Sequence, residues 1–236
     1  MQVHQVVSRE AWLTARKEHL AKEKEFTRLR DQLSQARRDL PWVKVKKDYV
    51  FAGPNGQETL SDLFDGRSQL IVYHFMYGPD WTAGCPGCSF WADNFNDTVV
   101  HLNRRDISLV AVSRAPLDRL EAYKKRMGWD FNWVSSLDSN FNYDYHVSFT
   151  PDEVEKGEMF YNFRLGKVSS EEASGVSVFY KDSQGNIFHT YSCYSRGLDI
   201  LNAAYHYMDL VPKGRDEDAL PYPSAWLQRH DEYDES

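Results

Sequence analysis

Residues 70–102, LIVYHFMYGPDWTAGCPGCSFWADNFNDTVVHL, decide the fold of this chain. Leu70–Tyr77 is an apolar run rich in β-branched and aromatic residues, which predicts a strand buried inside a parallel sheet. Gly78, Pro79 and Asp80 follow it and predict a turn. Beyond this turn, apolar residues recur at helical spacing at Trp91, Phe95, Val99 and Leu102. The stretch therefore predicts a strand, a loop and a helix.

Two cysteines stand where this helix is expected to begin, in Cys85-Pro86-Gly87-Cys88. Pro86 suits the first helical position, because its missing N–H costs nothing there. Cys85 then lies at the N-cap, where the partial positive charge of the helix favours a thiolate. Cys88 follows one turn later, about 5–6 Å away between Cβ atoms, which is close enough for a disulfide. The spacing predicts a reactive Cys85 with Cys88 as its resolving partner.

Two other interpretations of the pair stay open. It could be half of a zinc site, but such a site needs a second cysteine pair or two histidines. The one further cysteine is Cys193, with His189 four residues before it. The pair could also be inert packing, since free cysteines are often buried, and this is our interpretation of Cys193. The strand-to-helix context favours redox chemistry for Cys85 and Cys88, and we expect no metal.

Composition excludes several function classes. The chain has 236 residues, three cysteines and a net charge of −7. No long basic face is present, so we expect no nucleic-acid partner. No apolar run approaches the roughly 20 residues of a membrane span, and residues 1–10 lack an apolar signal core. Three cysteines do not form a secreted disulfide framework, and we therefore expect a cytoplasmic protein without a membrane partner.

The first 41 residues are expected to form a helical extension. Residues 8–38 are rich in Ala, Leu, Lys, Glu and Arg and contain neither Gly nor Pro. Leu40–Pro41 ends the helix. An apolar seam runs along it at spacings of three and four, at Phe26, Leu29, Leu33, Ala36 and Leu40. The seam is a candidate contact for a second copy of the chain in a homodimer, or for the rest of the domain.

The remaining pattern predicts an α/β fold, a thioredoxin-like mixed sheet with helices on both faces. Strands are expected at 42–51, 70–77, 107–112 and 133–137, and 176–180 with 187–193 form a hairpin. Helices are expected from 86, 116 and 197 onwards. Residues 42–211 would form this domain, with an insertion at about 150–174. Residues 212–236 read as a polar tail with a disordered end from 230, for which Arg196, Arg215 and Glu217 are candidate anchors.

Motifs along nearly the whole chain carry a family resemblance. They are EKEFTRLRD, LPWV, DGRSQLIVYHFMYGPDW, GCPGCSFWAD, VAVSRAPL, MGW, NYDYHVSFT, VSVFY, YSCYSRG and PKGRDE. With them the chain resembles the bacterial thioredoxin-like family catalogued as domain of unknown function 899. The resemblance implies a thioredoxin-like fold and a dithiol–disulfide oxidoreductase activity.

The same region is similar in part to peroxiredoxins. Those enzymes carry a Thr three residues before the reactive cysteine, as Thr82 stands before Cys85. The Pro that begins their motif is displaced, and Tyr77 occupies its place. Their Arg before the late strand is replaced by Ser174 and Gly175. Peroxide reduction needs a positive charge beside the developing anion, and the Arg that would supply it is missing here. A thiol peroxidase is therefore the alternative function and not the first one.

Further residues complete the expected site. His74 could accept the proton of Cys88, or could be a hydrogen-bonded core histidine. Trp81 could cover Cys85 and bind substrate, or could simply pack. Thioredoxins place a cis-Pro in their docking loop, and here Gly175-Val176 stands in its place. The catalytic candidates are Cys85, Cys88, His74 and Thr82, and the substrate-binding candidates are Trp81, Pro86, Gly175 and Val176.

The sequence therefore predicts a thiol–disulfide oxidoreductase in which Cys85 attacks and Cys88 resolves. Its expected partners are a protein or small-molecule disulfide and an external thiol reductant, with no bound cofactor. A non-catalytic thioredoxin-fold binding protein that keeps the cysteines as a local clasp is a further alternative.

Overall fold

The computed structural model describes residues 4–168 and 170–233. The chain divides into two compact units, residues 1–41 and 42–236. The first unit is α1 (Arg9–Arg38), which covers the helix expected for residues 8–38. The side chain of Ser8 caps it by accepting a hydrogen bond from the Ala11 N–H at 3.2 Å.

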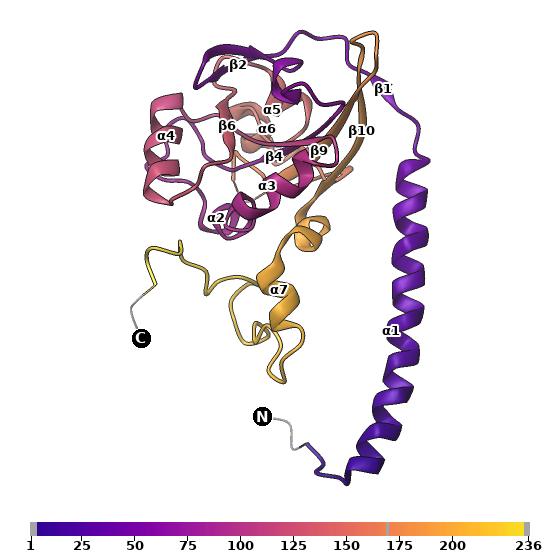
Figure 1. Cartoon of the computed structure of the whole chain (residues 1–236). Helices are drawn as coiled ribbons and strands as arrows, with labels where there is room; N and C mark the ends of the chain where they lie inside the picture. The colour runs from indigo at the N-terminus through magenta and orange to yellow at the C-terminus, as the bar shows by residue number, and fades with distance from the viewer. Residues whose placement is uncertain (1–3, 169, 234–236) are drawn as a thin grey trace. The chain divides into compact units, whose positions relative to one another are not determined.

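A mixed sheet forms the second unit, with strand order β1-β10-β9-β4-β5-β6-β2-β3 among the described residues (Figure 1). β4, β5 and β6 are parallel, and β9 pairs antiparallel both with β4 and with its hairpin partner β10. The strands are β1 (Val43–Lys44), β2 (Val50–Gly53), β3 (Gly56–Thr59), β4 (Gln69–His74), β5 (Ile107–Ser113), β6 (Asn132–Ser135), β9 (Gly175–Lys181) and β10 (Ile187–Tyr194). Parallel crossovers followed by an antiparallel hairpin confirm the thioredoxin-like fold.

Two buried clusters cover the two faces of the sheet. Side chains alternate along β4, so Tyr73 and Phe75 enter one cluster while Val72 enters the other. The first cluster packs against α2, α3 and α4, and the second against η1 and α5. These helices are η1 (Asp62–Phe64), α2 (Pro86–Ala92), α3 (Asn96–Asn103), α4 (Leu117–Arg126) and α5 (Phe141–Asp144). Helices therefore lie on both faces, as predicted.

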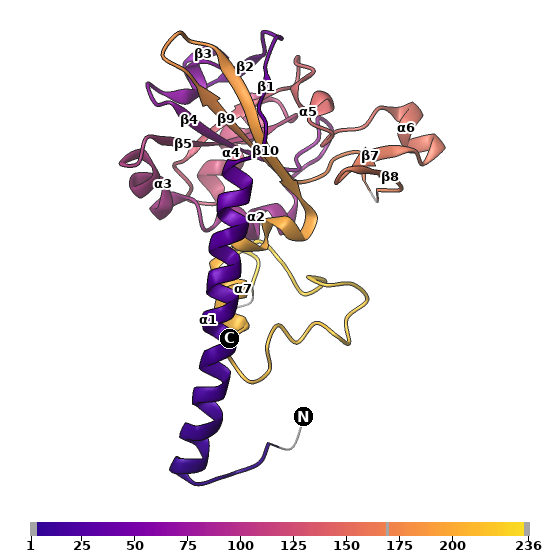
Figure 2. The same ribbon diagram turned by 90° about the vertical axis from the view of Figure 1, so that its right-hand side faces the viewer.

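The region expected as an insertion contains α6 (Pro151–Lys156) and the small hairpin β7 (Met159–Tyr161) and β8 (Arg164–Gly166). This hairpin and α6 project from the side of the sheet (Figure 2). After β10 the chain continues through η2 (Ser195–Leu201) and α7 (Ala203–Met208) into the C-terminal segment.

Three expected elements are interrupted. The strand predicted at 42–51 splits into β1 and β2. The helix predicted from Pro86 to Leu102 breaks between α2 and α3, because the Asn94 side chain donates to the Phe90 and Trp91 carbonyls at 3.0 and 3.1 Å. The helix predicted at 197–208 breaks at buried Asn202, whose side chain caps α7.

The disorder expected from residue 230 is wrong for residues 230–233. His230 lies 2.7 Å from Asp93, and Asp231 pairs with Arg126 at 2.6 Å. Residues 234–236 lie outside the described residues. Across the described ranges, no helix is both long and apolar enough to span a membrane.

Candidate active site

Cys85 stands at the N-terminus of α2, where the loop after β4 ends. Its N–H donates to the Met76 carbonyl at 3.0 Å, which ties this loop to the end of the sheet. Its carbonyl accepts from both the N–H and the hydroxyl of Ser89, at 3.0 and 2.9 Å. Pro86 follows as the first helical residue, as predicted. The backbone thus fixes Cys85 at the N-cap.

The two thiols have opposite acidities. Cys85 is half-buried, whereas Cys88 is 3 % exposed. The Cys88 thiol as hydrogen-bond donor lowers the pKa of Cys85 to about 6, against the effect of burial. The N–H groups of Cys88 and Gly87 and the charge of Arg229 act in the same direction. Burial raises the pKa of Cys88 well above its usual value. The pair therefore holds a thiolate beside a thiol.

Cys88 is held against the end of β4. The Met76 N–H donates to its sulfur at 3.3 Å, and the Tyr73 hydroxyl is a second donor. Both donors would stabilise negative charge on this sulfur, although burial dominates in the reduced protein. Cys88 is therefore the more buried of the two thiols and is fixed at the end of β4.

Arg229 is a site residue that the sequence analysis missed. Its Nη2 and Nε donate to the Gly84 carbonyl at 2.7 and 3.1 Å, and Nε also donates to the Tyr123 hydroxyl at 2.9 Å. Gly84 precedes Cys85, so the guanidinium lies beside the helix N-terminus. No local pattern identifies this residue, because 145 positions separate it from Gly84.

His74 lies away from the cysteines. Its ring packs with Phe141 and Tyr145, on the face of the sheet opposite the cluster that contains Cys88. Its Nε2 is 2.8 Å from the Ser177 hydroxyl. Burial lowers its pKa to about 3, so the ring is neutral at physiological pH. The structure does not bring His74 to Cys88, and its surroundings are those of a core histidine.

The other expected site residues differ in position. Thr82 is exposed, and its carbonyl accepts from the Tyr77 hydroxyl at 3.4 Å. Trp81 is half-buried, and its Nε1 donates to the Glu171 carboxylate at 3.2 Å. Gly175 and Val176 begin β9, directly beside β4, and both are buried. Backbone pairing therefore brings their loop to the end of the strand that precedes the cysteines.

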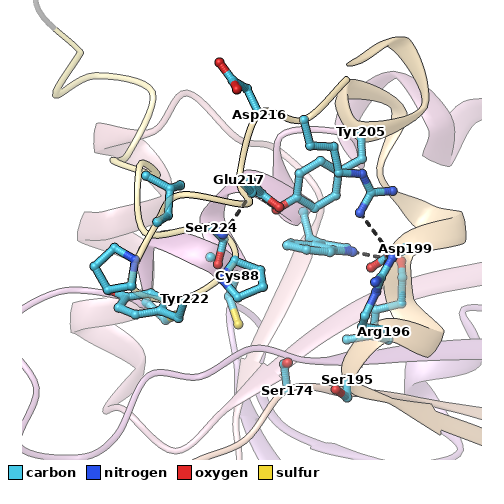
Figure 3. A pocket seen from close by; sticks show the side chains of 18 of the residues that line it. Cys88, Ser174, Ser195, Arg196, Asp199, Tyr205, Asp216, Glu217, Tyr222 and Ser224 are labelled. Carbon is cyan, nitrogen blue, oxygen red and sulfur yellow. Dashed lines mark hydrogen bonds and ion pairs between the residues drawn. The ribbon is translucent and has the colours of Figure 1, made fainter. Parts of the chain in front are cut away.

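A cavity of about 800 Å³ opens in front of the two sulfurs. Figure 3 shows Cys88 between Tyr222 on one side and the Arg196–Asp199 pair on the other. Ser174, the residue before Gly175, lies at its edge. Most of the remaining wall comes from residues 213–224, so the C-terminal segment builds the site together with α2 and η2.

Two of the three predicted anchors hold this C-terminal segment. Arg215 pairs with Asp199 at 3.0 Å and with Asp209 at 2.9 Å, and it stacks on Tyr205. Glu217 accepts hydrogen bonds through one oxygen from three groups. They are the Tyr205 hydroxyl at 3.0 Å, the Ser224 N–H at 2.9 Å and the Trp226 Nε1 at 2.7 Å.

Cys193 lies on β10 opposite Val176 and is buried. It belongs to the same buried cluster as Cys88, so it lies on the cysteine face of the sheet. Within residues 4–168 and 170–233, no group of three or more His, Cys, Asp or Glu side chains is arranged to hold a metal ion.

Known proteins resemble the chain in structure, and one known family matches its sequence. The chain is similar in structure to peroxidoxin BcpB from Mycobacterium tuberculosis, with a TM-score of 0.46, 15 % identity, and coverage of 70 % of this chain and 94 % of that one. It is also similar to a peroxiredoxin Q of Xanthomonas campestris, with a TM-score of 0.45, 18 % identity, and coverage of 67 % and 90 %. No curated protein matches the chain. The family model described as "Bacterial protein of unknown function (DUF899)" matches residues 1–233, and the chain therefore belongs to that family.

Proposed function

We propose that this protein is a thiol–disulfide oxidoreductase that uses Cys85 and Cys88. The Cys85 thiolate attacks one sulfur of a substrate disulfide and forms a mixed disulfide, while the other substrate sulfur leaves as a thiolate. Cys88 then attacks the Cys85 sulfur, loses its proton and releases the second substrate thiol. The two electrons come from the cysteine pair, and an external thiol reductant restores them.

The observation that carries the proposal is the opposite acidity of two neighbouring thiols. With a pKa of about 6, Cys85 is largely a thiolate at pH 7, which is the form that attacks a disulfide. The negative charge of Cys85 is one of the causes that raise the pKa of Cys88. Formation of the mixed disulfide removes this charge, so Cys88 becomes more acidic when it is required to attack.

A thiol peroxidase is a second candidate, and Arg229 is the observation that favours it. Its positive charge lies near Cys85, although it comes from the C-terminal segment and not from the loop before β9. A cation near the sulfur can support a developing oxyanion. A binding protein that keeps the pair as a clasp is a third candidate, and it requires Cys85 to have an ordinary acidity.

The test traps the mixed disulfide. Reduced Cys88→Ser protein is mixed with 2-hydroxyethyl disulfide, and the adduct is located by peptide mass spectrometry. We expect one adduct, on Cys85, whereas the parent protein yields a Cys85–Cys88 disulfide. Cys193→Ser serves as the matched control and should behave like the parent. A main adduct on Cys193, or the absence of any exchange, would contradict the proposal.

A further inference from the structure

We infer that the substrate is a low-molecular-weight disulfide that carries both amino and carboxylate groups, and not the disulfide of a folded protein. This inference rests on the proposed function of Cys85 and Cys88. It comes from the way in which residues 209–233, the C-terminal strap, pass over the cysteines.

The strap is fixed beside Cys85 at its far end. Arg229 binds the Gly84 carbonyl through two nitrogens, at 2.7 and 3.1 Å. Immediately after it, His230 contacts Asp93 just beyond α2, and Asp231 pairs with Arg126 on α4. Three successive residues of the strap therefore hold it against the cysteine helix and its neighbour.

The strap is also fixed at its near end. Arg215 binds Asp199 on η2, and Glu217 binds the Tyr205 hydroxyl on α7. Glu217 also accepts from the Ser224 N–H and the Trp226 ring nitrogen, which closes residues 217–226 into a loop. Figures 1 and 2 both show the strap at the α2 end of the sheet. The cysteines are thus approached through the cavity that this loop borders.

The size of that cavity limits the substrate. At about 800 Å³, it lies within the range of small-molecule sites. To present its disulfide, a folded protein would have to place the backbone on either side of that disulfide against the cysteines. Residues Leu220–Ser224 of the strap line this space and would be in its way. A peptide-sized disulfide can enter without displacing them.

The charges around the cavity indicate the chemistry of the substrate. Arg196 and Arg215 both pair with Asp199, and Arg215 also pairs with Asp209, whereas Glu217 accepts hydrogen bonds only from neutral donors. The remaining charged side chains of the wall form no ion pair with another described residue, and they are Lys213, Asp216 and Asp218. With Glu217, one cation and three carboxylates of the wall lack an ion pair to another described residue, and such a set suits a ligand with carboxylate and ammonium groups.

The reaction balances without any other group. One substrate disulfide takes two electrons from the pair, one substrate thiolate and one substrate thiol leave, and Cys85 becomes bonded to Cys88. A single turnover of the reduced protein therefore needs no added reductant.

The test measures that single turnover with three probes. They are oxidised glutathione, which is zwitterionic, 2-hydroxyethyl disulfide, which is neutral, and insulin, which is a protein. We expect the rate constant for oxidised glutathione to exceed that for each of the others by about tenfold or more. Lys213→Gln should lower the glutathione rate relative to the hydroxyethyl rate by about 3- to 10-fold.

Strap variants provide the second arm. Glu217→Ala removes three hydrogen bonds of the strap, whereas Glu217→Gln keeps an acceptor oxygen as the matched control. We expect Glu217→Ala to raise the insulin rate relative to the glutathione rate by about tenfold, and Glu217→Gln to change this ratio little. If insulin reacts with the parent protein as fast as oxidised glutathione does, or if Glu217→Ala leaves the ratio of the two rates unchanged, the inference about the substrate fails, and the proposed function is unaffected. If no probe oxidises the parent protein, the proposed function fails with it.

Discussion

The Arg229 guanidinium donates two hydrogen bonds to the carbonyl of Gly84, the residue that precedes Cys85. A side chain close to the end of the chain thus sets part of the electrostatic field at the first cysteine. The helix N-terminus alone favours a thiolate, and the arginine adds a full charge to it. The acidity of Cys85 therefore depends on the C-terminal strap as well as on the Cys-Pro-Gly-Cys motif.

Replacement of Arg229 by Met should raise the pKa of Cys85 by about 0.5–1 unit, because a nearby positive charge favours the thiolate. The measurement is the rate of alkylation of Cys85 against pH, followed by mass spectrometry. In the parent protein its midpoint should lie near pH 6. Arg229→Lys is the matched control, since it keeps the charge and loses the two-pronged contact. Equal midpoints in the Met variant and the parent would show that the charge has no effect on Cys85.

The site is predictable from the sequence only where its contacts are local. Pro86 and Cys85 adopt their expected positions because helix initiation depends on adjacent residues. The thioredoxin-like strand order follows from apolar runs and turns, which are also local. Arg229 cannot be found in this way, since its partner Gly84 is distant in sequence and no periodic pattern links them.

His74 shows a different limit of the sequence. A residue at the end of a buried strand can face either side of the sheet, and the apolar run 70–77 lacks the alternation that would reveal which. In the structure, the Tyr73 hydroxyl contacts Cys88, and the His74 ring packs against Phe141 on the other face of the sheet. The break in the helix after α2 could not be predicted from apolar spacing either, because it depends on the Asn94 side chain, which donates hydrogen bonds to backbone carbonyls of α2.

Glu172 should make stability depend on pH. It is 1 % exposed, lies 3.0 Å from Arg114, and accepts from the Ser148 hydroxyl at 2.5 Å. Burial raises its pKa from the usual 4.5 to about 7. A carboxyl whose pKa is higher in the folded protein than in the unfolded chain stabilises the fold most at pH values below the unfolded pKa, here 4.5. This stabilisation is lost as the pH rises through 7.

The test compares Glu172→Gln with the parent by denaturant unfolding at several pH values. The stability of the parent relative to the variant should fall by about 1–3 kcal/mol between pH 5 and pH 8. Glu155→Gln, at an exposed carboxylate on α6 that is not among the groups acting on Glu172, is the control and should show no such trend. A constant difference between Glu172→Gln and the parent over this range would contradict the role given to burial.

The helix unit should pair two copies of the chain. Phe26, Leu29 and Leu33 form one apolar seam on α1, which Leu40 extends just beyond the helix, and these four side chains are exposed. Spacings of three and four are those of a short coiled-coil seam. We expect a dimer in sedimentation velocity, and Leu29→Gln with Leu33→Gln should shift the protein to monomer. Arg28→Gln with Arg30→Gln is the control, and a parent protein that sediments as a monomer would exclude the pairing.

Hydrogen peroxide should be a poor substrate, even though a cation lies near Cys85. Each nitrogen of Arg229 already has a partner: Nε and Nη2 bind the Gly84 carbonyl, and Nη1 binds the Glu232 carboxylate. The guanidinium therefore acts on the thiolate through its charge, and to donate these same N–H groups to a peroxide oxygen it would have to break a hydrogen bond with the protein. Thr82, which stands three residues before Cys85 as a Thr does in peroxiredoxins, is exposed.

Absence of one such donor typically slows a reaction that builds up negative charge by about 10²–10³-fold. Stopped-flow oxidation of the reduced protein by hydrogen peroxide, followed by tryptophan fluorescence, measures the rate constant. We expect a value near that of a free thiolate at the same pH, and Cys193→Ser should not change it. A rate constant several orders of magnitude higher, abolished by Cys85→Ser and lowered by Arg229→Met, would instead make peroxide the substrate. In that case the strap would have to rearrange to release a nitrogen of Arg229, and Arg126→Ala, which removes its neighbouring contact with Asp231, would raise the peroxide rate further.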